Sequence, residues 1–252
     1  MQLTALVREP LPSFVRAVST HFAKHTLNYE RALIEHRAYT RALKAAGARL
    51  VFLAGSDSLP DGPFVEDTAV IFPDHALICP MKEASRQAET ASVAEALRPL
   101  RRIDTLPPPA TLDGGDVLDT DDTLYVGLSR RSNREAARIL AQHANKPVIP
   151  VAVRGGLHLK TSATYLGGGT IVLYPAQVDA PGFQGLDRIV VTEKERYAAN
   201  CLAIGETVLM PAGFPRVAGE IKQRGFQVVE LPMGEFEKAD GGVTCLSLRV
   251  PG

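Results

Sequence analysis

Residues 64–97, FVEDTAVIFPDHALICPMKEASRQAETASVAEAL, contain the unit from which the fold is predicted. Two apolar runs, Phe64 to Phe72 and Ala76 to Cys79, are typical of strands, and the alanine-rich stretch 87–97 is typical of a helix. Further strand-like runs are expected at 50–53, 123–128, 148–153, 170–174, 188–192, 207–210, 226–231 and 243–250, and helices at 29–43, 133–143 and 214–224. This cycle repeats about every 50 residues, about five times. Either an open α/β sheet or a ring of ββαβ modules would produce it.

The composition favours one large domain over residues 1–252. The chain is 45% hydrophobic, enough for a sizeable core, and its proline cluster at 107–109 is too short to be a linker. Lysine plus arginine and aspartate plus glutamate each number 28, so no net field would attract nucleic acid or anionic lipid. A small-molecule ligand is therefore expected, with no nucleic-acid or membrane partner.

Several classes of protein are disfavoured by what the sequence lacks. It shows no signal peptide and no apolar run of membrane-spanning length, which predicts a cytoplasmic protein. It has no glycine-rich phosphate loop, and the glycines at 167–169 lie between apolar runs, as in a hairpin turn. Three widely spaced cysteines fit neither a disulfide framework nor a zinc site. We expect no metal or organic cofactor.

Four segments could carry chemistry, and the first contains the adjacent acids Glu66 and Asp67 within an apolar run. Side chains of neighbouring strand residues point to opposite faces, so both acids are exposed only if the strand ends there. Solvated acids at a strand end are the simpler interpretation. A carboxylate pair that binds a planar cation is the functional one.

The second and third segments contain an acid and a histidine. In Asp113-Gly-Gly-Asp116 a turn is the simplest explanation, although the two glycines could direct a carboxylate inward. His158 lies between two leucines, where a packed histidine is as common as a reactive one. The other five histidines are less promising, since His36 lies on a helix face and the rest, at 21, 25, 75 and 143, lie in segments that look exposed.

The fourth segment places Cys245 directly after Asp240-Gly-Gly, where a loop is expected to enter a strand. Cys79 and Cys201 fit the ordinary pattern of small buried hydrophobic residues. A cysteine at a loop-to-strand junction can project into a cleft, and nucleophilic catalysis would require a nearby acid/base. His158 is the best candidate for that partner.

These segments in this order, with Ala84-Ser-Arg86-Gln-Ala-Glu89 and Gly127-Leu-Ser-Arg130-Arg131-Ser-Asn133, resemble the dimethylarginine dimethylaminohydrolases of the guanidino-group modifying superfamily. The resemblance covers nearly the whole chain. It implies the pentein fold, a five-bladed α/β propeller of ββαβ modules with a central active site, and cleavage of asymmetric dimethylarginine to citrulline and dimethylamine. It leaves a homodimer as an open alternative to a monomer.

The resemblance also assigns roles to individual residues. It implies that Cys245 and His158 are catalytic and that Asp113 orients the histidine. Residues expected to contact substrate are Glu66 and Asp67 at the guanidinium, Asp61 at the amino group, Arg86 and Arg131 at the carboxylate, Asp240 beside the nucleophile, and Phe22 in a lid.

Two alternatives to this function remain. Deiminases of the same superfamily that act on unmethylated arginine or agmatine typically carry His-x-Asp, whereas Lys160 occupies the third position here, which favours the dimethylarginine branch. A deiminase of the same fold is the first alternative. A non-catalytic module that binds arginine derivatives is the second, although binding alone would require neither Cys245 nor His158.

Overall fold

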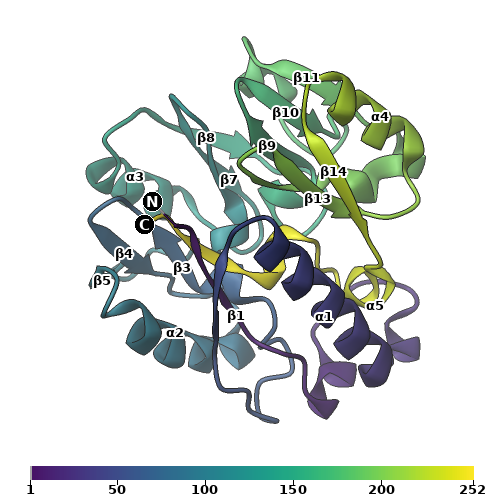
Figure 1. Cartoon of the computed structure of the whole chain (residues 1–252). Coiled ribbons are helices and arrows are strands. Elements are labelled where there is room, and N and C mark those ends of the chain that lie inside the picture. Colours follow the sequence, from purple (N-terminus) through teal and green to yellow (C-terminus); the bar gives the residue numbers. More distant parts are fainter. Residues whose placement is uncertain (1) are drawn as a thin grey trace.

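Five three-stranded sheets form a ring in the structure, a computed structural model that describes residues 2–252 (Figure 1). In each sheet the middle strand pairs antiparallel with an inner strand and parallel with an outer one. From inner to outer the sheets are β15-β1-β2, β3-β4-β5, β6-β7-β8, β9-β10-β11 and β12-β13-β14. The predicted ring of ββαβ modules is therefore confirmed.

The strands are short, three to five residues each. Their bounds are β1 (Thr4–Val7), β2 (Arg49–Phe52), β3 (Ala69–Ile71), β4 (His75–Ile78), β5 (Arg102–Thr105), β6 (Val117–Asp119), β7 (Leu124–Leu128), β8 (Val148–Ala152), β9 (Ala163–Gly167), β10 (Thr170–Leu173), β11 (Asp187–Val190), β12 (Leu202–Ile204), β13 (Thr207–Pro211), β14 (Gln227–Leu231) and β15 (Leu248–Val250).

The α-helices of four modules lie on the outside of the ring (Figure 1). They are α1 (Tyr29–Ala45), α2 (Thr90–Leu97), α3 (Arg134–His143) and α4 (Pro215–Gln223), with a further short helix α5 (Gly234–Lys238) before the last inner strand. In the β9-β10-β11 module the connection is a 3₁₀ turn, η7 (Ala180–Phe183). Local sequence explains the helix starts: Asn28 and Asn133 cap α1 and α3 by accepting a hydrogen bond from a first-turn N–H.

The ring is closed by strands from the two ends of the described chain. β15 pairs antiparallel with β1, with Val250 opposite Thr4, and β1 continues parallel to β2. The labels N and C lie side by side in Figure 1. This pairing fixes the segment that carries Cys245 against the first module.

Two predicted strands were too long at their first residues. Val65 to Thr68 form a 3₁₀ turn, η3, and only Ala69–Ile71 form β3. Thr244–Leu246 likewise form a 3₁₀ turn, η9, before β15. Glu66, Asp67 and Cys245 thus lie in turns, where successive side chains diverge, instead of alternating across a strand. The hairpin predicted at 167–169 is confirmed, since it joins the antiparallel strands β9 and β10 and all three glycines have positive φ.

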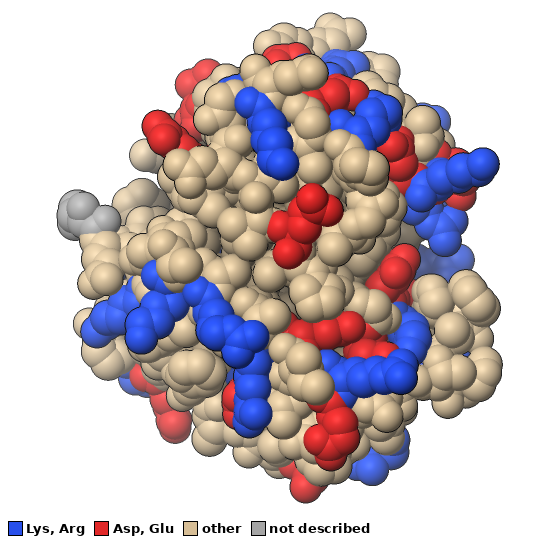
Figure 2. All heavy atoms as spheres, turned by 45° about the vertical axis from the view of Figure 1, so that its right-hand side comes forward, with Lys and Arg blue, Asp and Glu red and all other residues tan. Residues whose placement is uncertain are grey.

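The surface agrees with the balanced composition. On the face drawn in Figure 2, basic and acidic side chains are both present and in places lie side by side, with uncharged areas and one row of basic residues elsewhere. Across residues 2–252, none of the helices combines the length and apolarity needed to cross a bilayer.

Candidate active site

Five 3₁₀ turns meet at one end of the ring, each directly before the inner strand of its module. They are η3 (Val65–Thr68), η5 (Gly114–Asp116), η6 (Leu159–Thr161), η8 (Glu193–Ala199) and η9 (Thr244–Leu246). Asn200, directly after η8, connects η8 to η9. Its amide NH₂ donates to the Thr244 hydroxyl and to the Lys160 carbonyl, and its amide oxygen accepts from the Thr244 N–H. Residues far apart in the sequence are thereby gathered around one point.

His158 lies between two carboxylates from neighbouring turns. Its Nε2 is 3.0 Å from Asp113 Oδ2 and its Nδ1 is 3.8 Å from Asp67 Oδ1. Burial alone would lower the pKa of the imidazole, but the charge of Asp67 and the bond to Asp113 outweigh it and raise that pKa to about 9. The ring is therefore an imidazolium at neutral pH.

Asp67 is held in place by a second set of contacts. It accepts a hydrogen bond from Arg86 at 2.7 Å and one from the Gly115 N–H at 3.0 Å. Burial favours the neutral acid, yet His158 and Arg86 keep the pKa of Asp67 at about 2. Only glycine fits at position 115, because a Cβ there would lie 2.7 Å from His158 Nδ1 and 2.8 Å from Asp67 Oδ1.

Asp113 is fully buried, and its Oδ1 has no hydrogen-bond donor among the described residues. Asp116, also fully buried, has three donors: the hydroxyls of Ser129 and Ser132 and the N–H of Leu159. The two acids of one motif thus differ. Asp116 fixes the turns, whereas Asp113 keeps an unused acceptor beside His158.

Cys245 lines the same pocket as His158 and is partly exposed. Removal from bulk water, with the charges of Glu66 and Asp67, raises the pKa of the thiol to about 12. The thiol of Cys245 is therefore neutral at neutral pH, while His158, which lines the same pocket, is protonated. Cys79 and Cys201 are buried away from this pocket, and Cys201 Sγ donates to the Ala198 carbonyl.

The pocket is closed by the segment that precedes α1. The Val18 N–H donates to Asp61 at 3.1 Å, and both the N–H and the hydroxyl of Thr20 donate to Asp240. Asp240 adopts a left-handed conformation, with φ of 55°, which is uncommon for a residue other than glycine. The remaining cavity is only ≈ 10 Å³, about the space that one water molecule needs.

Comparison with known proteins identifies the family. The family model described as "N,N dimethylarginine dimethylhydrolase, eukaryotic" matches residues 16–249. The chain is 35% identical to the N(G),N(G)-dimethylarginine dimethylaminohydrolase of Pseudomonas aeruginosa, over 97% of this chain and 98% of that one. It belongs to the dimethylarginine dimethylaminohydrolase family.

Two further comparisons agree with this assignment. The dimethylarginine dimethylaminohydrolase of Streptomyces coelicolor is 37% identical, over 98% of this chain and 96% of that one. The structure of a cysteine-to-serine mutant of the Pseudomonas aeruginosa enzyme, complexed with citrulline, superposes with a TM-score of 0.94 at 31% identity, covering 99% of this chain and all of that chain. This likeness supports the pentein fold.

Eight of the ten site residues predicted from the dimethylarginine dimethylaminohydrolase resemblance gather here. Asp113 does not line the pocket but is hydrogen-bonded to His158, which does. The seven residues that line it are Asp61, Asp67, Arg86, Arg131, His158, Asp240 and Cys245. Phe22 is not among them, because its side chain lies 85% exposed on the outer surface of the closing segment.

Glu66 is the other exception. Its carboxylate accepts hydrogen bonds from Thr244 at 2.7 Å and Arg249 at 2.6 Å, and it pairs with Lys160 at 2.7 Å. Glu66 thus lines the central cavity, and the structure does not bring it to the pocket that Asp67 lines. The two neighbouring side chains thus face different cavities, whereas the resemblance assigned both to the guanidinium.

Arg86 is also more constrained than predicted. Its guanidinium donates to Asp67, to both oxygens of Glu89 and to the Phe64 carbonyl. Glu89 and Asn200 were not singled out from sequence. Nothing marks Asn200 in a single sequence, whereas Glu89, three residues after Arg86 in a helical pattern, could have been found as an ion-pair partner.

Asp67, Asp113 and His158 are close enough to hold a metal ion, with one ligand atom of each within 4.8 Å of the others. Their protonation disfavours it. The imidazolium must lose a proton before it can bind a metal, and Arg86 already neutralises Asp67.

Proposed function

We propose that this chain hydrolyses the guanidinium C–N bond of Nω-methylated arginines and releases citrulline and a methylamine. The observation that carries the proposal is that Asp67 and His158 line one pocket with Cys245, while Asp113 holds His158 from its buried side. A planar guanidinium in this pocket can donate N–H groups to Asp67. Cys245 lines the pocket that this cation would enter.

The first step is activation of the nucleophile by substrate. In the free enzyme the negative charges of Glu66 and Asp67 help to keep Cys245 protonated. A bound guanidinium cation offsets that charge, lowers the pKa of Cys245 and releases its proton to solvent. Chemistry therefore begins only when substrate is in place.

The second step transfers the amidine carbon to sulfur. Cys245 Sγ attacks the guanidinium carbon to give a tetrahedral intermediate, and the imidazolium of His158 protonates the departing dimethylamine. A thiouronium remains on Cys245. Neutral His158 then takes one proton from water as its oxygen adds to the same carbon. Loss of the thiolate, with transfer of the remaining hydroxyl proton to the sulfur, gives citrulline and restores the thiol of Cys245.

The amino-acid end of the substrate has its own contacts. We assign its amino group to Asp61 and Asp240, whose carboxylates here accept hydrogen bonds from the closing segment. Arg131 is the available partner for its carboxylate, since its own contacts are long, 3.4 Å to Asp113 and 3.9 Å to Glu83. Arg86, saturated by protein acceptors, is better placed to position Asp67.

Lys160 supports the dimethylarginine branch over the deiminase alternative. The deiminases typically carry an acid at this position, whereas the ammonium of Lys160 pairs here with Glu66 at the central cavity. Recognition of the methyl groups then depends on the shape of the pocket.

A substrate panel tests this function directly. Asymmetric dimethylarginine, arginine and agmatine should be supplied separately, with dimethylamine, ammonia and the ureido product measured. Two buried methyl groups are worth about 1.6 kcal/mol, so kcat/KM for dimethylarginine should exceed that for arginine by about tenfold. Agmatine, which lacks the carboxylate, should be a poor substrate.

The outcomes separate the alternatives. A higher kcat/KM for arginine would move the assignment to a deiminase, and efficient cleavage of agmatine would refute the role of Arg131. If the chain bound all three compounds and formed no product, it would be a non-catalytic module that binds arginine derivatives.

Other features of the proposed enzyme rest on the sequence. These are a single catalytic domain over 1–252, a cytoplasmic location, function without metal or organic cofactor, the absence of nucleic-acid and membrane partners, and a homodimer as the alternative to a monomer. Equilibrium sedimentation of the purified chain measures the last of these.

A further inference from the structure

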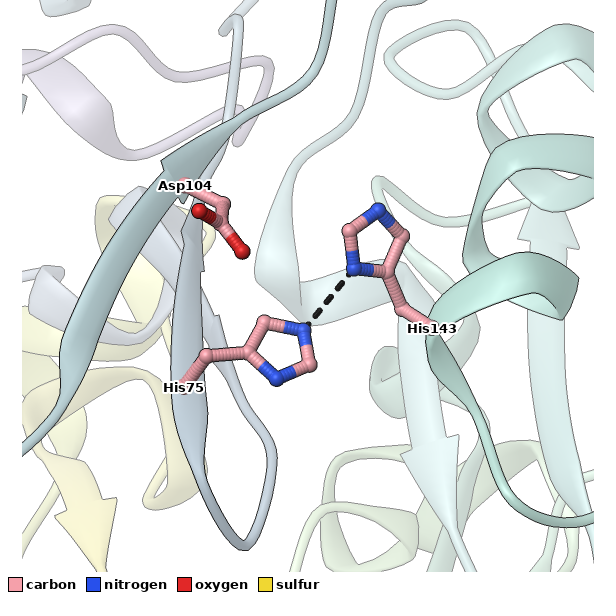
Figure 3. A group of neighbouring side chains, drawn as sticks. All are labelled: His75, Asp104 and His143. Carbon is pink, nitrogen blue, oxygen red and sulfur yellow. Dashed lines mark hydrogen bonds between the residues drawn. The ribbon is translucent and has the colours of Figure 1, made fainter.

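A second group of metal-binding side chains lies outside the active site, formed by His75, Asp104 and His143 (Figure 3). His75 begins β4, Asp104 lies in the adjacent strand β5, and His143 is the last residue of α3. One ligand atom of each lies within 4.8 Å of the others, and none of the three lines the pocket of Cys245. The proposed hydrolysis uses none of them.

The two histidines face each other through ring nitrogens. His75 Nε2 lies 2.8 Å from His143 Nδ1 (Figure 3). The other nitrogen of His75, Nδ1, lies 2.8 Å from Asp74 Oδ1, a carboxylate that can only accept a hydrogen bond. Asp74 therefore fixes the tautomer that leaves the lone pair of Nε2 directed at His143. Such a carboxylate–histidine pair is the usual support of a metal-ligating imidazole.

The surroundings hold these groups in place. His75 is buried, contrary to its exposed appearance in the sequence, and its ring stacks on Phe72 with centroids 4.6 Å apart and an 8° interplanar angle. His143 occupies the C-terminal end of α3, where the helix dipole favours a cation. Asp104 pairs through one oxygen with Arg102, whose side chain is 65% exposed and free to turn away.

From this arrangement we infer that the chain has a second site, which binds a divalent transition-metal ion of the Zn²⁺ type. His75 Nε2, His143 Nδ1 and a carboxylate oxygen of Asp104 supply three ligands, and water completes a tetrahedron. At metal–nitrogen distances of about 2.0–2.1 Å the two nitrogens must separate to about 3.3 Å, a small shift from the hydrogen-bonded distance. Binding replaces one proton on His143 Nδ1, which passes to solvent.

The bound ion would join two blades of the ring. His75 and Asp104 belong to the β3-β4-β5 module, whereas His143 belongs to the β6-β7-β8 module. These two modules also contribute Asp67 and Asp113 to the active site. Since the ion binds only where the modules are packed together, it stabilises the folded chain by mass action.

The test uses the whole, untagged chain with Cys245→Ser, so that the active-site thiol cannot take the metal. Co²⁺ and Zn²⁺ are titrated by calorimetry, and the Co²⁺ complex is followed by visible absorption. We expect one ion per chain and a melting temperature that rises with Zn²⁺ and returns on chelation. His143→Asn and Asp104→Asn should each weaken binding at least about tenfold.

Two controls separate this site from others. His25→Asn removes an exposed histidine outside the cluster and should leave the affinity unchanged. With Cys245 restored, His143→Asn should turn over dimethylarginine as the parent does, which shows that it folds. Absence of binding at millimolar metal, or equal affinity in the parent, His143→Asn and Asp104→Asn chains, overturns the inference. So does binding that survives both substitutions but is lost on Asp67→Asn.

Discussion

The active-site pocket and the central cavity of the ring receive one carboxylate each from the same turn. Asp67 lines the pocket and Glu66, its neighbour, lines a cavity of ≈ 770 Å³ surrounded by the five inner strands. Burial would raise the pKa of Glu66, but Lys160 and Arg249 lower it, and with Thr244 they supply donors to both of its oxygens. Glu66 is thus neutralised by the protein itself.

The neighbouring acid has a different setting. Asp67 pairs with Arg86 and with the imidazolium of His158, and it lines the pocket together with Cys245. The proton donor His158 and the thiol of Cys245, both with shifted pKa values, gather at the smaller space, so these groups and not the size of the space mark the reactive end of the ring.

Removal of the nucleophile or its proton donor should produce the largest effect at the pocket. Cys245→Ser and His158→Ala should each lower kcat by at least about 10³-fold, because both bond-making steps pass through them. Cys201→Ser, a buried thiol outside the pocket, should keep kcat near the parent value. Steady-state release of dimethylamine measures this. A comparable loss of kcat in a folded Cys201→Ser chain would refute the assignment of the nucleophile.

Matched substitutions of Asp67 and Glu66 test the difference between the active-site pocket and the central cavity. Asp67→Asn should lower kcat/KM by about 100-fold, because it removes a charge that binds the cation and supports the imidazolium. It should also move the alkaline limb of the pH–rate profile to lower pH, since Asp67 is the main cause that raises the pKa of His158.

Glu66→Gln should have the opposite signature. It leaves Lys160 and Arg249 without their buried counter-charge and should lower the free energy of unfolding by about 3 kcal/mol, with kcat/KM within about tenfold of the parent. Denaturant titrations and steady-state kinetics on both variants supply the data. If Glu66→Gln lowered kcat/KM more than Asp67→Asn did and left the free energy of unfolding unchanged, the roles assigned to the two acids would be wrong.

The remaining predicted effects appear only at the limits of the pH range and concern two buried histidines with opposite surroundings. His36 has no hydrogen-bond partner in the described structure, and burial, with Arg37 nearby, lowers its pKa from 6.5 to about 4. Folding therefore favours neutral His36. The contribution of His36 to the free energy of unfolding is complete above pH 6.5 and is lost as the pH falls toward 4. The loss is about 3 kcal/mol.

For His158 the sign reverses. The pKa of His158 is about 9 in the folded chain and 6.5 in the unfolded chain. Its contribution to the free energy of unfolding is therefore complete below pH 6.5 and disappears as the pH rises through 9. Unfolding free energies of the parent, His36→Leu and His158→Asn chains between pH 4 and 9.5 report both effects. His36→Leu should flatten the acid side alone and His158→Asn the alkaline side alone; unchanged slopes would contradict the two shifts.

The local signals predicted strands and helices in a repeating cycle, and the set of motifs that occur together indicated the ring and a group of residues, most of which the structure gathers at one pocket. The sequence missed strands such as β5 (RIDT) and β12 (LAI), whose short length and mixed polarity give no clear periodicity. It assigned Glu66 and Asp67 to the same guanidinium because the resemblance did so, although side chains of adjacent residues diverge in a strand and in a 3₁₀ turn alike. Lys160 was noted only as a difference from the deiminases, and its pairing with Glu66 depends on two modules meeting in space.

The pairing of β15 with β1 has a consequence for how the protein is made. During synthesis β1 emerges before every other described strand and must wait for β15, which emerges after all of them. Closure over almost the whole length of the chain is entropically costly and slow, so the first blade stays incomplete while the others form. Cys245 lies directly before β15 and joins His158 only at that closure. In a nascent chain, Asp67 and Asp113 can therefore be in place well before Cys245 reaches them.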